Sequence, residues 1–220
     1  MGQGASSVQF AGRTWTVKES AAPVGPGPNL FSAGNIEVDG HGLHLHIART
    51  GAGWTCAEVA AQGLFGYGTY EWMLATDVTR LDSSAVLGMF TWSDVADDTH
   101  REIDIEFGRF GRPSTTRTGR FTVQAGVPIS SPAFALPPSR RSRHTLTWRL
   151  GHVTAASEAP GSAPVRWSVT DAAVPRPGGD VAPRINLWLY QGARPAAPQH
   201  VTVEHFGYTP LPTGLTPLSV

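Results

Sequence analysis

Short runs that alternate apolar and polar residues recur along this chain, and Gly, Pro, Asp and Asn separate them. A two-residue period is typical of strands that bury one face. No segment of a dozen residues or more has the spacing of an amphipathic helix. The pattern predicts an all-β domain, a β-sandwich of two antiparallel sheets. The expected strands are 36–38, 43–48, 56–60, 68–74, 85–91, 102–107, 121–124, 144–149, 185–190 and 201–206, with loops at 22–29 and 157–164.

The length and the charge balance limit what such a domain binds. The 220 residues suit a single all-β domain, 1–220, and we expect it to be monomeric. Seventeen basic and seventeen acidic residues cancel, so the chain offers no net field to nucleic acid or to an anionic membrane surface. No apolar run is long enough to span a bilayer, and the single Cys56 forms no intrachain disulfide. A neutral partner such as a polysaccharide fits this composition best.

The segment REIDIEFG contains the strongest candidate for chemistry. Glu102, Asp104 and Glu106 alternate with Ile103, Ile105 and Phe107. Successive side chains of a strand point to opposite faces, so the three acids form one row above a face that packs into the core. A solvated polar face gives the same alternation. No Lys or Arg shares the parity of the acids within the strand, however, and burial with mutual repulsion is the condition that separates carboxyl pKa values at catalytic sites.

Several motifs together resemble glycoside hydrolase family 16. They are EIDIEF, FGYGTYEW at 65–72, GMFTW at 88–92, INLWL at 185–189, DGHGLHL at 39–45 and a closing strand with FGYTP. The similarity spans about 31–210 in consistent order. The resemblance implies a concanavalin A-like jelly roll of two curved antiparallel sheets, with an open cleft for β-glucans or related galactans. It also implies an extracellular protein that needs no cofactor for catalysis, and a structural calcium ion is known in the family.

The resemblance carries catalytic roles onto the three acids. Glu102 becomes the nucleophile and Glu106 the general acid and base of a retaining endo-acting glycosidase, with Asp104 between them. Retaining enzymes hold the two catalytic carboxyls about 5–5.5 Å apart. Four residues along a strand cover about 13 Å, so the two Glu side chains must lean toward one another, and Asp104 is placed to hydrogen-bond to Glu102.

Aromatic and amide side chains are the candidates for holding a sugar chain. Flat rings offer apolar surface to pyranose C–H groups. Trp188 is the strongest candidate, and Asn186 and Tyr190 share its strand face. Trp92 fits the cleft or the core equally well, and Gln124 is a further candidate for reaching the substrate.

The substrate and even catalysis itself stay open at this point. Mixed-linkage β-glucanases of the family tend to carry Trp two residues before the nucleophile, where this chain has His100, which on parity faces the same way as the acids. Many β-1,3-glucanases of the family insert a residue before the last Glu, and EIDIE lacks it, so the chain resembles the regular-strand branch of lichenases and xyloglucan-active transglycosylases. We expect a β-1,3- or β-1,3-1,4-glucan as substrate. The alternatives are a transglycosylase and a non-catalytic carbohydrate-binding protein with the same sandwich.

A metal site is not expected from the side chains. His44 and His46 alternate along an expected strand, but no third ligand is indicated, so zinc is not expected. The family's calcium ligands include backbone oxygens, which a sequence does not reveal.

Overall fold

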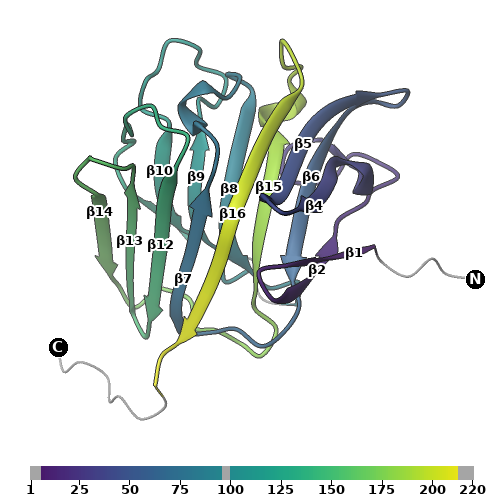
Figure 1. Ribbon diagram of the computed structural model, residues 1–220. Coiled ribbons are helices and arrows are strands. Elements are labelled where there is room, and N and C mark those ends of the chain that lie inside the picture. Colours follow the sequence, from purple (N-terminus) through teal and green to yellow (C-terminus); the bar gives the residue numbers. More distant parts are fainter. Residues whose placement is uncertain (1–5, 96–99, 213–220) are drawn as a thin grey trace, which may run out of the picture.

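Two curved layers of antiparallel strands lie face to face in the computed structural model, which describes residues 6–95 and 100–212 (Figure 1). The second sheet, in front in Figure 1, has the order β4-β5-β16-β7-β12-β13-β14. The first sheet, behind it, has the order β11-β10-β9-β8-β15-β6-β2-β1. The first sheet consists of β1 (Ser7–Phe10), β2 (Arg13–Val17), β6 (Gly53–Ala61), β8 (Ala85–Trp92), β9 (Ile103–Gly108), β10 (Gly119–Val123), β11 (Ile129–Ser130) and β15 (Ala182–Leu189). The second consists of β4 (Ile36–Asp39), β5 (Gly42–Thr50), β7 (Gly68–Leu74), β12 (Ser142–Arg149), β13 (His152–Glu158), β14 (Val165–Thr170) and β16 (Gln199–Pro210).

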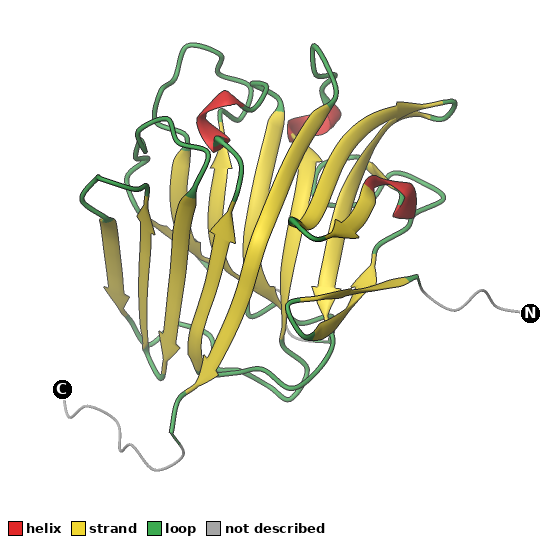
Figure 2. Cartoon of the chain, viewed as in Figure 1, coloured by secondary structure: helices red, strands yellow, loops and turns green. Residues whose placement is uncertain are grey.

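The two sheets are joined along one side. The hairpin of β5 and β6 pairs Ala48 with Thr55 and Thr50 with Gly53, so hydrogen bonding continues from one layer into the other. A short strand, β3 (Leu30–Phe31), runs parallel to β6. Helical structure is confined to single 3-10 turns, namely η1 (Ala33–Asn35), η2 (Val78–Arg80) and η3 (Tyr190–Gly192), as Figure 2 shows. No helix of the described chain is long and apolar enough to cross a membrane.

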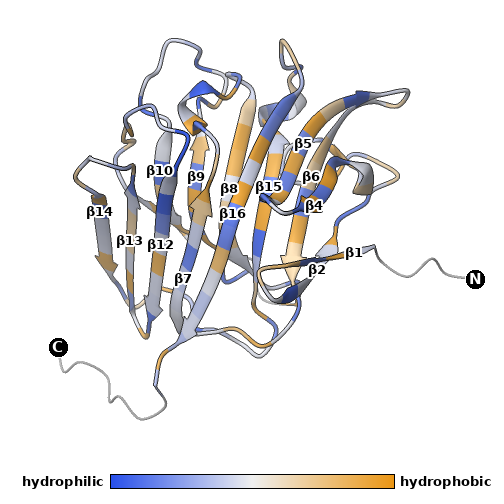
Figure 3. Ribbon diagram, in the orientation of Figure 1, coloured by the Kyte–Doolittle hydropathy of each residue, from blue (hydrophilic) through white to orange (hydrophobic). Residues whose placement is uncertain are grey.

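The hydrophobic core fills the space between the layers. Trp15, Trp72 and Trp148 are completely buried there, among aromatic and branched aliphatic residues of both sheets. On β9, Ile103, Ile105 and Phe107 point into this core and leave the acids on the opposite face. The residues of β8 before Trp92 are buried on both faces of the strand, which Figure 3 shows in apolar colours. The side chains of β8 that point away from the core are therefore shielded by their neighbours, and a cavity is found on that face of the sheet.

The all-β sandwich predicted from the sequence is confirmed, and each expected strand overlaps an observed one. The expected loop at 22–29 is present and is closed by a bridge between Val24 and Asn29. The expected loop at 157–164 begins later, because β13 continues to Glu158. The sequence reading missed β13 and β14, and also the hairpin of β1 and β2, which lies before the region of resemblance.

Trp15 ties the hairpin of β1 and β2 to the core. Its ring meets Phe206 of β16 edge-on at 5.1 Å between centroids, and its Nε1 donates to the Phe10 carbonyl at 3.0 Å. We expect Trp15→Ala to lower the free energy of unfolding by about 3–5 kcal/mol, because it removes a fully buried ring. Urea titration measures this change, with Leu64→Ala as the control, since Leu64 is 84% exposed. A loss below about 1 kcal/mol in Trp15→Ala shows that the hairpin is dispensable to the core.

Candidate active site

Strand register places the three acids on the floor of one cleft. Asp104 pairs with Phe90 of β8 and Thr122 of β10, while Glu106 pairs with Gly88 and Arg120. Directly opposed residues of antiparallel strands point to the same face, so each acid belongs to a row of side chains that crosses the sheet. Glu102 lies just before β9 begins at Ile103 and still lines the same cavity as Asp104 and Glu106.

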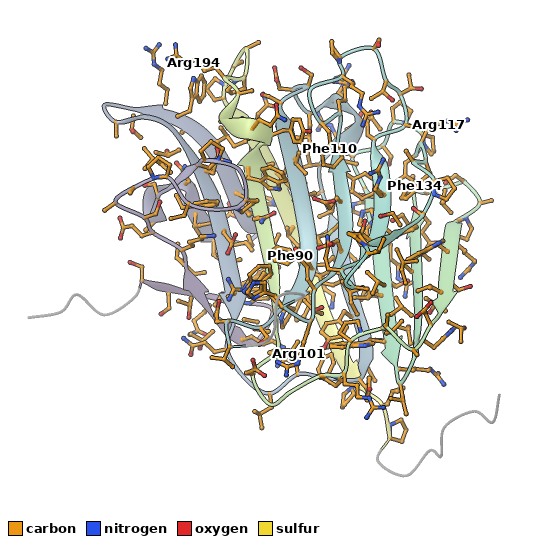
Figure 4. The ribbon with its side chains drawn as sticks, turned by 180° about the vertical axis from the view of Figure 1, so that it is seen from behind. Phe90, Arg101, Phe110, Arg117, Phe134 and Arg194 are labelled. Atoms are coloured by element: carbon orange, nitrogen blue, oxygen red, sulfur yellow. The ribbon has the colours of Figure 1, made fainter. Side chains whose placement is uncertain are left out.

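This cleft cavity has a volume of about 430 Å³ and mixed walls. Phe90, Trp92 and Trp188 give it apolar surface, while the acids and Asn186 give it polar groups. Figure 4 looks onto this side of the molecule and labels Phe90. Concave sites with apolar walls and a few convergent polar groups are typical of binding sites for small molecules and sugars.

Gly88 keeps the centre of the floor open. It pairs with Glu106 on one side and with Asn186 on the other. A Cβ at this position lies 2.5 Å from Asn186 Oδ1, so any larger residue displaces that amide. Asn186 is buried, and its Oδ1 has no hydrogen-bond partner among the described residues, although its Nδ2 lies 3.3 Å from Glu58.

Asp104 is the most deeply buried of the three acids. Burial raises its pKa well above the usual value, and the nearby charges of Glu102 and Glu106 raise it further. Gln124 Nε2 donates to Asp104 Oδ2 at 3.1 Å. A protonated Asp104 then donates to Glu102, and this hydrogen bond lowers the pKa of Glu102 against the larger, opposing effect of burial. Asp104 therefore favours the ionised form of its neighbour.

Glu106 has the pKa expected of a proton donor at neutral pH. Burial raises its pKa to about 7, and repulsion from Glu102 adds to the effect. The positive charge of Arg120, its cross-strand partner, acts in the opposite direction. Burial thus raises the pKa of both glutamates, but a hydrogen bond from Asp104 opposes the rise at Glu102, whereas repulsion adds to it at Glu106.

A fourth carboxylate in the cleft was missed from the sequence. Glu58 of β6 has a side chain only 3% exposed and is held by Lys18 and Arg184, each at 3.2 Å. Arg184 also places its guanidinium 5.6 Å from the ring centroid of Trp92. The signal for Glu58 was a lone charge within the apolar run CAEVAA, but its partners come from other strands and have no sequence spacing that reveals them.

The predicted sugar-binding residues divide into two groups. Trp188, Asn186 and Trp92 line the cleft cavity as expected, so Trp92 belongs to the cleft rather than to the core. Gln124 does not line the cavity, since its amide is directed at Asp104. Tyr190 begins a 3-10 turn just after β15 and does not line the cavity, but its ring lies beside that of Trp188, with centroids 6.4 Å apart.

His100 also departs from the expectation based on parity. His100 and Arg101 have positive φ angles of 51° and 54°, so the chain is not extended before β9 and alternation does not apply there. The imidazole stacks on Trp92, with centroids 4.1 Å apart, and lies beside the cleft cavity instead of lining it. It supports an aromatic wall, and its charge lowers the pKa of Glu102.

The two metal ions considered from the sequence, zinc and calcium, have no set of side-chain ligands among the described residues. The described residues contain no group of three or more His, Cys, Asp or Glu side chains placed to hold an ion. His44 does meet a histidine that the sequence reading overlooked, since its Nδ1 lies 3.0 Å from His200 Nε2. The calcium ion implied by the resemblance stays a prediction.

Comparison with solved structures identifies the fold. A Bacillus licheniformis β-glucanase superposes with a TM-score of 0.67 at 18% identity, covering 89% of this chain and 91% of its own. A glycoside hydrolase family 16 endo-glucanase from Bacteroides ovatus, in complex with G4G3G-2F-DNP, gives 0.67 at 12% identity, covering 89% and 94%. The chain has the fold of family 16 β-glucanases.

The same fold includes a protein named for lacking the activity. A Mycobacterium tuberculosis immunostimulatory antigen and pseudo β-1,3-glucanase superposes with a TM-score of 0.64 at 20% identity, covering 87% of this chain and 88% of its own. No protein-family model and no curated protein sequence matches the chain. At these identities the comparisons establish the fold, and activity must be argued from the site.

The raised pKa of Glu106 predicts a pH-dependent cost to stability. The carboxyl ionises near pH 4.5 when unfolded and near 7 when folded, so its contribution to stability is present below pH 4.5 and is lost as pH rises through 7. We expect Glu106→Gln to raise the unfolding free energy at pH 8 by about 1–3 kcal/mol and to change it little at pH 4. Thermal unfolding at both pH values measures this. Glu19→Gln, at an exposed position, is the control, and an equal gain at both pH values contradicts the assignment.

Proposed function

We propose that this protein is a retaining, endo-acting glycoside hydrolase that cleaves a β-linked polysaccharide. The observation that carries the proposal is the row of Glu102, Asp104 and Glu106 on the floor of an aromatic-walled cleft, where a hydrogen bond favours the ionised form of Glu102 and burial raises the pKa of Glu106 to about 7. The cleft residues come from four neighbouring strands, β6, β15, β8 and β9, which span about 14 Å at the usual strand spacing. The acids lie along β9 at one edge of this span, and the binding groups of β8, β15 and β6 extend from them across the sheet.

Two displacements at one anomeric carbon complete the reaction. Glu106 donates its proton to the glycosidic oxygen while the Glu102 carboxylate attacks the anomeric carbon and forms a glycosyl-enzyme ester. Loss of the leaving chain makes Glu106 a carboxylate, which then takes a proton from water as that water attacks the ester. The product keeps the β configuration. Asp104 holds Glu102 by a hydrogen bond throughout and is a positioning residue.

A β-1,3- or β-1,3-1,4-glucan is the substrate that we propose for this reaction. Strand β9 keeps an unbroken register with β8 from Thr91–Ile103 to Val86–Gly108, which is consistent with the regular-strand branch that includes lichenases. Bacteroides ovatus and Bacillus licheniformis proteins named as glucanases have the same fold. A transglycosylase uses the same ester but passes it to a second sugar, so product analysis separates the two. We further propose that the protein works outside the cell, where polymeric glucans are met.

A non-catalytic carbohydrate-binding protein is the second candidate function. The pseudo β-1,3-glucanase of Mycobacterium tuberculosis favours it, since that protein has the same fold. The buried acids of this chain favour the enzyme, because a protein that only binds sugar gains nothing from carboxyls whose desolvation is costly.

Removing the nucleophile separates these two functions. We expect Glu102→Gln to lower turnover of lichenan or laminarin at least about a thousandfold and to leave sugar binding and folding intact, because the amide keeps the shape but cannot attack. Reducing-end assays measure turnover, proton NMR of the first product measures its anomeric configuration, and Glu37→Gln on β4 is the control. If the wild type cleaves these glucans and Glu102→Gln cleaves them equally fast, Glu102 is not the nucleophile. A wild-type protein that binds these glucans without cleaving any of them supports the binding protein.

The pH profile tests the role of Glu106. We expect kcat to fall as pH rises above about 7, because the general acid loses its proton there. An aryl glycoside with a dinitrophenolate leaving group is the matched comparison, because dinitrophenolate departs without needing a proton. The rate at which the glycosyl-enzyme ester forms from this substrate therefore stays constant at high pH. Equal profiles for polysaccharide and aryl glycoside argue against Glu106 as the acid.

A further inference from the structure

Three arginines and no acidic residue lie between β9 and β10, and a fourth arginine is the second residue of β10. Arg109, Arg112, Arg117 and Arg120 line a cavity of about 40 Å³, together with Phe110 and Thr118. A single water needs roughly 10–15 Å³, so the cavity has room for several oxygen-sized groups. The charge of the whole chain cancels, but this part of it is locally positive.

Arg109 holds the segment in place. Its guanidinium donates to the carbonyls of Leu81 at 2.7 Å, Thr79 at 2.9 Å and Thr115 at 3.3 Å. These acceptors are neutral, so the bonds fix the loop without cancelling the charge. Within the described chain, none of the four arginines forms an ion pair with a carboxylate.

Two buried polar atoms of the cavity have no protein partner. Arg120 Nε and Thr118 Oγ1 are both buried and lack a hydrogen bond among the described residues. Thr118 as a whole is only 4% exposed. A buried donor left without an acceptor costs about 1–3 kcal/mol, and more when it is charged, so these atoms indicate a missing acceptor group.

The cavity adjoins the catalytic row on the side of Glu106. Arg120 is the direct cross-strand partner of Glu106, and both point to the cleft face. Aromatic rings connect the two cavities, since Trp188 lies 6.4 Å from Tyr190, which lies 5.7 Å from Phe110, between ring centroids. Figure 4 shows Phe110 and Arg117 toward the same end of the sheet, away from Arg101. A sugar chain that passes Glu106 can therefore continue over these rings to the arginines.

We propose that the cavity formed by Arg112, Arg117, Thr118 and Arg120 binds an oxyanion substituent, a sulfate ester or a carboxylate, on the sugar beside Glu106. The inference rests on the proposed function, in that it takes the cleft to bind a glycan. Planar guanidinium groups bind both oxyanions through paired N–H donors, and Thr118 adds a hydroxyl. The proposed β-glucan substrate is thereby one that carries anionic substituents, which the net charge of zero had not suggested.

One backbone with three substituents tests the proposal. Unmodified, sulfated and carboxymethylated laminarin are titrated into the full chain at constant ionic strength, and binding is measured by calorimetry. We expect the wild type to bind at least one charged form about tenfold more tightly than the neutral form, and Arg120→Gln and Arg117→Gln to lose most of that advantage. Arg149→Gln is the matched control, with the same charge change at an exposed position at the end of β12 in the second sheet. The charged form that is preferred distinguishes sulfate from carboxylate.

Inorganic sulfate gives a test that is independent of the sugar backbone. Sulfate replaces chloride at constant ionic strength, and the melting temperature is followed. Sulfate raises stability in general, so only the difference between variants counts. We expect sulfate to raise the melting temperature more in the wild type and in Arg149→Gln than in Arg120→Gln or Arg117→Gln. The side chain of Arg117 is exposed, so its replacement is not expected to disturb folding. The proposal is overturned if sulfate raises the melting temperature equally in all four proteins. It is also overturned if Arg149→Gln loses as much binding of the charged polymers as Arg120→Gln and Arg117→Gln do.

The two proposals fail in different ways. Cleavage of neutral glucan with no preference for charged forms removes the oxyanion site and keeps the hydrolase. Preference for a charged form that depends on Arg120, without cleavage of any polymer, keeps the oxyanion site and removes the hydrolase.

Discussion

Glu102, Asp104 and Glu106 lie in one buried row, where loss of water and mutual repulsion act on all three, and the rest of the site depends on how this conflict is resolved. Full ionisation of the row is unfavourable, so protons are retained where burial is greatest. Asp104 is the most buried and has a pKa raised well above its usual value, while Glu106 follows with a pKa of about 7. The different pKa values of the three acids come from this competition for protons.

The large core beneath the row offsets the unfavourable free energy of burying three acids. Ile103, Ile105 and Phe107 anchor β9 on one face, and β8 and β10 pair with it on both sides, so the acids are held by the sheet itself. Positive charge arrives from neighbouring strands. Arg184 and Lys18 neutralise Glu58 at one side of the cleft, and Arg120 lies opposite Glu106 at the other. The cleft thus has two distinct sides, one with paired charges and one beside arginines that form no ion pair within the described chain.

The local patterns predicted much of the sandwich. Strand β7 matches its expected bounds, because GTYEWML alternates cleanly between buried and half-exposed positions. Strand β13 was missed because HVTAASE consists largely of small or polar residues. Strand β14 was missed although VRWSVT alternates apolar and polar residues, and none of its residues is fully buried. The hairpin of β1 and β2 was missed for another reason. Its packing rests on Trp15 meeting Phe206 of β16, a contact between distant parts of the chain that no local pattern encodes.

The sequence by itself determined the identity and order of the three acids and the aromatic character of the cleft, because strand alternation is a local property with a period of two. Tertiary structure decided the rest. It brought Glu58, Arg184 and Arg120 to the acids through strand pairing, turned Gln124 toward Asp104, and set His100 against Trp92 at a bend where alternation ends. These placements depend on which strands are neighbours and in what register they pair, and that is settled by the packing of the whole sandwich rather than by any one segment.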